Sequence, residues 1–97
     1  MKERIISITP SGRKGKKYVA TVGNGRKIHF GASDYEQFKD STGVGKYSSK
    51  NHGDSKRRKS YFLRHSGVQF KKDAVKKEVK KSNGTYTAKL LSHLFLW

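Results

Sequence analysis

The chain has 97 residues, of which 23 are Lys or Arg and 7 are Asp or Glu, so its formal net charge is +16. This length allows one domain, and because only 32% of the residues are hydrophobic, its core must be thin. There is no Cys, which excludes disulfides and thiolate metal sites, and no apolar run reaches the roughly 20 residues needed to span a bilayer.

The N-terminal segment predicts a β-strand followed by a basic loop. β-Branched residues recur between Arg4 and Thr9, and the turn-forming sequence Pro10-Ser11-Gly12 ends this run. The loop holds four cations, Arg13, Lys14, Lys16 and Lys17. An excess of positive charge attracts anionic partners, so these four side chains are candidate contacts for one.

Two alternating segments joined by Asn24-Gly25 predict a β-hairpin over Tyr18–Gly31. Apolar residues alternate along 18–22, and Ile28 and Phe30 share one face of the return strand. Asn and Gly are the residues best able to adopt the positive φ angles of a tight hairpin turn.

The residues after the hairpin predict a short helix and then a loop. Either Ser33 or Asp34 can cap a helix that runs through Phe38, because both side chains accept hydrogen bonds from free backbone amides. Gly, Ser, Lys and Asn dominate residues 41–53, a composition typical of flexible loops.

A basic helix is predicted next. Asp54 or Ser55 can cap it, and it runs to about Ser66, where Gly67 ends it. Cations at the start of a helix oppose its dipole, and a bound anion would remove that penalty. We therefore expect the contact point for an anionic partner here, formed by Lys56, Arg57, Arg58, Lys59 and, further along, Arg64.

The segment from Phe70 to Lys81 is ambiguous. Its few apolar residues lie at helical spacing, but the segment could equally stay loosely ordered until a partner binds. Its cations Lys76, Lys77, Lys80 and Lys81 complete the set of candidate anion-binding residues.

The C-terminal segment, Thr85 to Trp97, predicts an apolar helix. Its large apolar residues cover too much of the circumference for a surface helix, so it is either the central core element or a hydrophobic anchor for a partner. Lys89 and His93 are four residues apart and are expected on its outward face. The anchor would consist of Leu90, Leu91, Leu94, Phe95 and Trp97.

Together these elements predict an α+β fold in one basic domain, residues 1–97. Residues 1–31 would form a small antiparallel sheet, and two or three short helices from residues 32–97 would pack against it.

Several short motifs resemble a family of small basic proteins of poorly defined function. The most specific are HFGA at 29–32, the Arg64-His65 pair and the closing LLSHLFLW, and the resemblance spans roughly residues 17–97. Members occur in large double-stranded DNA viruses, such as those of algae and amoebae, and in some phages. The resemblance implies a viral origin and a place in the virion.

No arrangement of residues indicates catalysis or a bound cofactor. The His and acidic residues lack the spacing of a metal site, and Gly43-Val44-Gly45-Lys46 lacks the flanking pattern of a phosphate-binding loop. We therefore expect a non-enzymatic protein without cofactors, made in the host cytoplasm and not secreted, since the N-terminus does not have the pattern of a signal peptide.

Two functions remain open from the sequence. The first is a minor capsid or cement protein that binds acidic surfaces of larger capsid proteins through its cations and apolar tail. The second is a nucleic-acid-binding protein that neutralises viral DNA without reading its sequence. The sequence slightly favours the capsid or cement role, because a folded hairpin with an apolar C-terminal element is more than a DNA-condensing protein needs.

Overall fold

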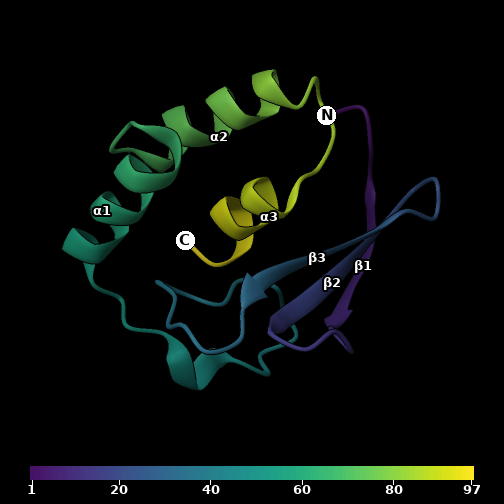
Figure 1. Ribbon diagram of the computed structural model, residues 1–97, viewed down its shortest axis with the longest axis horizontal. Coiled ribbons are helices and arrows are strands. Elements are labelled where there is room, and N and C mark those ends of the chain that lie inside the picture. Colours follow the sequence, from purple (N-terminus) through teal and green to yellow (C-terminus); the bar gives the residue numbers. More distant parts are fainter.

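Three strands precede three helices in the computed structural model, which describes residues 1–97 and has the predicted α+β architecture (Figure 1). The elements are β1 (Ile5–Pro10), β2 (Lys16–Val22), β3 (Lys27–Ala32), a 3-10 turn η1 (Ser48–Lys50), α1 (Ser55–Ser66), α2 (Lys71–Lys81) and α3 (Ala88–Phe95). The strands form one antiparallel sheet in the order β1-β2-β3.

The β2–β3 hairpin buries one face of the sheet, as its alternating sequence predicts. Tyr18 pairs with Phe30 and Ala20 with Ile28, and all four side chains are buried. The turn differs in detail from the predicted Asn-Gly type. Gly25 N donates to Val22 O (2.8 Å), and only Gly25 in this turn has positive φ (85°), so the loop has three residues with a bulge at Gly25.

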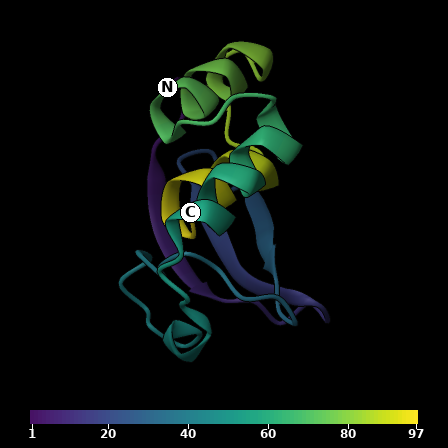
Figure 2. The same cartoon turned by 90° about the vertical axis from the view of Figure 1, so that its left-hand side faces the viewer.

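Helix α3 is the central layer of the molecule. Figure 2 shows α1 in front of it, α2 above it and the strands behind it. Leu90 and Leu91 are fully buried, and the Thr87 side chain caps the helix by accepting from Leu90 N (3.1 Å). The apolar C-terminal segment is therefore the core element, the first of its two predicted roles, and it does not present Leu90 or Leu91 as an anchor.

The ends of α1 match the predicted capping residues. The Asp54 side chain accepts from Lys56 N (2.9 Å) and Arg57 N (3.2 Å), and Gly67 ends the helix with φ 72°. The ambiguous segment after it forms α2, which packs on α1 and α3 through the buried side chains of Ala74 and Glu78.

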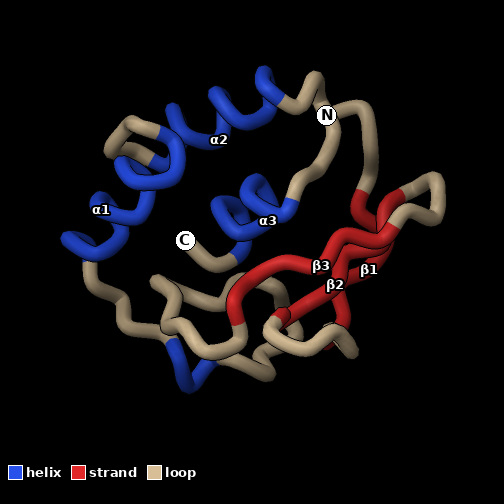
Figure 3. The backbone as a smooth tube through the Cα atoms, in the orientation of Figure 1, coloured by secondary structure: helices blue, strands red, loops and turns tan.

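The helix predicted through Phe38 is wrong. Residues 33–47 form turns and loop, coloured tan in Figure 3. The reason is Gln37, whose fully buried side chain donates to Tyr47 O (2.8 Å) and Asn51 Oδ1 (2.7 Å) and whose backbone bridges to Asn51. These contacts bind the segment to the next loop, and they are distant in sequence, so cap residues could not reveal them.

Candidate functional site

Most of the positive charge has no carboxylate partner. Arg26 pairs with Glu3 (2.6 Å) and Arg57 with Glu36 (2.9 Å), and these are the two ion pairs of the molecule. The other 21 of the 23 Lys and Arg side chains (23 − 2) face no carboxylate within ion-pair distance. The charge therefore has to be offset by counterions or by an anionic partner.

Three of the predicted anion-binding residues have internal roles instead. Lys17 is 2% exposed, and its Nζ donates to Tyr35 O (2.7 Å) and to the Gln37 side chain. Lys77 Nζ donates to Ser66 O (2.7 Å) at the end of α1, where a cation is favourable, and Arg58 Nε donates to Trp97 O (2.9 Å). These three side chains therefore have partners within the protein, and Lys17 is too deeply buried to offer its cation freely to a ligand.

The remaining predicted cations lie on separate surfaces. Arg13 and Lys14 are exposed in the turn between β1 and β2, Lys56 and Lys59 are exposed on α1, and Lys76, Lys80 and Lys81 are exposed on α2. Lys16, Arg57 and Arg64, by contrast, line a common cleft. The structure thus gathers only part of the predicted set into one concave site.

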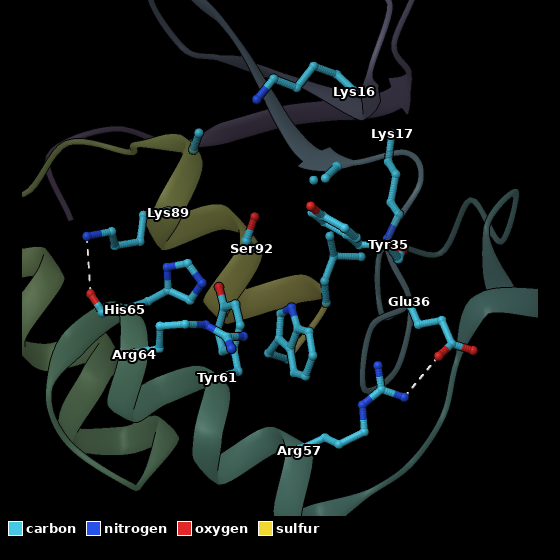
Figure 4. A pocket seen from close by; sticks show the side chains of 15 residues that line it. Lys16, Lys17, Tyr35, Glu36, Arg57, Tyr61, Arg64, His65, Lys89 and Ser92 are labelled. Atoms are coloured by element: carbon cyan, nitrogen blue, oxygen red, sulfur yellow. Dashed lines mark hydrogen bonds and ion pairs between the residues drawn. The ribbon is translucent and has the colours of Figure 1, made fainter.

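This cleft, with a volume of about 660 Å³, lies between the ends of β2 and β3, helix α1 and helix α3. In Figure 4, Lys16 and Tyr35 approach it from the sheet side, Arg57, Tyr61 and Arg64 from α1, and Ser92 from α3. Its polar lining contains one carboxylate, Glu36, which is already paired with Arg57. We call this space the basic cleft.

Aromatic side chains lie beside the cations of the basic cleft. Tyr61 and Trp97 stack with centroids 4.1 Å apart and rings 5° from parallel. Tyr35 is 73% exposed, while its backbone is fixed by the Lys17 bond to Tyr35 O and by the bond from Tyr35 N to Ala32 O (3.2 Å). The cleft therefore presents an exposed aromatic ring on a fixed backbone.

The basic cleft has a positive electrostatic environment. Burial, and then the charges of Arg64 and Lys89, hold the pKa of His65 below its ordinary value. Lys89 Nζ also donates to His65 O (3.2 Å), which keeps this cation at the cleft wall. An anion placed between these side chains would be attracted and would relieve their mutual repulsion.

Sequence reasoning missed Tyr35, His65 and Lys89 as members of this site. Tyr35 lies in the segment predicted as a helix, which does not form, and His65 and Lys89 lie on two different helices. His65 belongs to the Arg64-His65 motif, but Tyr35 and Lys89 lie outside the named motifs, and no local signal indicates that α1, α3 and the end of β3 converge.

His93 is fully buried, so its predicted place on the outward face of α3 is wrong. Ser66 Oγ donates its one proton to Glu78 Oε2 (2.9 Å) and must then accept from His93 Nε2 (2.7 Å). His93 Nδ1 accepts from the Tyr61 hydroxyl (2.8 Å). Burial lowers the pKa of His93 to about 4, so the side chain is neutral at pH 7, with its proton on Nε2 and Nδ1 as the acceptor.

The other His side chains make local contacts. His29 Nδ1 lies 2.6 Å from Ser11 Oγ, and His52 Nδ1 accepts from Asp54 N (2.9 Å). No group of three or more His, Cys, Asp or Glu side chains is placed to hold a metal ion. None of the helices has the length and apolar character required to cross a membrane.

The fold and the cleft define a small basic α+β domain with a cation- and aromatic-lined cleft beside its central helix. Residues 6–42 match a group described as "Family of unknown function (DUF5754)". This segment includes the sheet and the HFGA motif but neither the Arg64-His65 pair nor the C-terminal motif. No curated protein and no solved structure matches the chain.

Proposed function

We propose that this protein binds nucleic acid without catalysis, through phosphate contacts that do not depend on base sequence. The observation that carries the proposal is the shortage of internal charge compensation: two ion pairs serve 23 Lys and Arg side chains. Nucleic acids supply a dense row of negative charge, and cations that neutralise phosphates release bound counterions, which drives association.

The aromatic lining favours nucleic acid over an acidic protein surface. Bases stack on aromatic side chains, and proteins that bind single strands combine such rings with a positively charged groove. The basic cleft has both features, because the exposed Tyr35 lines the same space as Lys16 and Arg64. An acidic protein would satisfy the cations but would leave Tyr35 without a matching contact.

The capsid or cement role stays a second proposal, supported by the resemblance to proteins of large DNA viruses. Because Leu90 and Leu91 lie in the core, such a role would depend on electrostatic contacts and not on the predicted apolar anchor. Gentle disruption of virus particles separates the two: a genome-bound protein leaves with the DNA, whereas a capsid component remains with the emptied shells.

Binding to labelled single-stranded oligonucleotides tests the main proposal. Fluorescence anisotropy with several unrelated sequences should give similar affinities at low salt. The double variant K16Q/R64Q, which removes two cleft cations, should lose more affinity than K76Q/K80Q, which removes the same charge from the exposed face of α2.

Two results would overturn it. One is the absence of binding at about 50 mM salt, where phosphate contacts are strong. The other is an affinity confined to one sequence, because base reading, not charge, would then explain recognition.

A further inference from the structure

We infer that the basic cleft holds one unpaired nucleotide, with its base against Tyr35 and its phosphate between Lys16 and Arg64. This inference rests on the proposed function and adds the form of nucleic acid that the cleft accepts. The juxtaposition that supports it is an exposed aromatic ring and two carboxylate-free cations around one concave space, as Figure 4 shows.

The size of the cleft matches a small ligand and excludes a duplex. Its volume of about 660 Å³ lies within the range of small-molecule sites. Bases inside a duplex are paired and stacked, so a concave site of this size can receive a base only after it has been extruded. A base can enter this cleft only if it has left the stack, whereas duplex phosphates can reach the exposed cations of α1 and α2 from outside.

Tyr35 has the features of a stacking residue. Tyr35 is 73% exposed and packs against no other aromatic ring, so a face of its ring is available to a base. Its backbone is fixed through Lys17 and Ala32, so little conformational entropy is lost when a base covers the ring. The buried Lys17 therefore serves to position Tyr35.

The opposite wall carries a second aromatic surface. Trp97 is partly exposed in the cleft and is backed by Tyr61, which is 6% exposed and stacked against it. Tyr61 is in turn held by its hydroxyl bond to His93 (2.8 Å). Trp97 is thus a fixed ring close to the proposed base position, and it is the single Trp of the chain.

Lys16 and Arg64 supply charge from opposite sides. Neither has a carboxylate partner, whereas Arg57 is paired with Glu36 at the same cleft. Lys89 lies on the α3 wall and adds a further cation. A phosphate between these side chains gains attraction from both walls, and the nucleotide bridges the sheet and α1.

The emission of Trp97 provides the test. The intact protein is titrated with a short oligothymidylate, with an abasic strand of equal phosphate number, and with a hairpin duplex. We expect the oligothymidylate to quench Trp97 and to bind about tenfold more tightly than the abasic strand, in line with the contribution of base stacking. Tyr35→Ala should remove this difference and leave duplex affinity unchanged.

Phe70→Ala is the matched control, because Phe70 is also an exposed aromatic (60%) but lies outside the cleft. The inference is wrong if abasic and base-bearing strands bind equally, or if Tyr35→Ala changes no more than Phe70→Ala. The proposed function, by contrast, fails if none of the three probes, the hairpin duplex included, binds. Competition by thymidine monophosphate would identify a free nucleotide as the ligand, and its absence alongside strand binding would identify a nucleic acid strand.

Discussion

Neutral His93 makes the protein sensitive to acid. The unfolded chain protonates this side chain near its ordinary pKa of 6.5, whereas the folded chain holds it neutral down to about 4. Its contribution to the free energy of unfolding is therefore complete above pH 6.5 and is lost as the pH falls toward 4. The difference between the two pKa values corresponds to about 3 kcal/mol by pH 4.

The groups around His93 set this behaviour. Burial is the largest cause of the lowered pKa; Glu78 opposes it, and the charges of His65, Lys89 and Lys71 add to it. Protonation would also place a hydrogen on Nδ1, where Tyr61 now donates, so the hydroxyl would have to turn away. A loss of about 3 kcal/mol is large for a small domain with a stability of roughly 5–15 kcal/mol.

Urea unfolding followed by Trp97 fluorescence at pH 7.0, 5.5 and 4.5 measures the effect. His93→Asn does not titrate, so it should be less stable than the parent at pH 7 by about 1–3 kcal/mol, the cost of an impaired buried hydrogen-bond network. Its stability should then fall far less between pH 7 and 4.5. His29→Asn, on the outer face of the sheet, is the control and should retain most of the parent's loss. Equal losses in the parent and His93→Asn would refute the reasoning.

Three further predictions concern the fold. Gly31→Ala should lower the free energy of unfolding in urea by about 2–4 kcal/mol, because Gly31 has φ 80° and an added Cβ would lie 2.8 Å from Leu96 Cδ1. Gly12→Ala is the control, since Gly12 has open space around it, and it should leave the urea midpoint almost unchanged. Asp54→Ala should cost about 1 kcal/mol by removing the α1 cap, seen as a lower thermal midpoint; an unchanged midpoint would contradict the capping role. Burial lowers the pKa of Lys17 from 10.5 to about 8, so between these two pH values the unfolded chain binds more protons than the folded chain. The free energy of unfolding should therefore rise by about 1.5 kcal/mol from pH 8 to 9.5. A Lys17→Met variant should show no such rise, and an equal rise in both proteins would disprove the reasoning.

Local signals in the sequence predict the fold to a large extent. Alternation defines the hairpin, Asp54 and Gly67 mark the ends of α1, and the apolar content of residues 85–97 indicates a central helix. Each signal acts within a few residues of its position. These local predictions hold in the structure because the tertiary packing of each segment agrees with its local conformational preference.

The errors arise where distant segments meet. His93 lies one helical turn from the exposed Lys89 on α3, yet Ser66 of α1 and Glu78 of α2 cover it. No local sequence pattern predicts that α1 and α2 pack over the second turn of α3. Lys17 shows the same limit, because its partners Tyr35 and Gln37 lie 18 and 20 residues away, in a segment whose local sequence predicts a helix.

The candidate site could be predicted only in part. The composition shows an excess of cations, but the sequence does not indicate which of the basic segments form a binding site. Only folding separates Arg64 and Lys16, which line the basic cleft, from Lys77, which bonds to the end of α1.

The salt dependence of oligonucleotide binding tests the central claim most directly. If unpaired cations bind phosphates, the logarithm of the association constant should fall linearly with the logarithm of the salt concentration. Each phosphate contact contributes a slope of about −0.7 for single strands, so three contacts give about −2. A slope of −2 or steeper is the predicted result, and an affinity that does not change with salt would contradict the account.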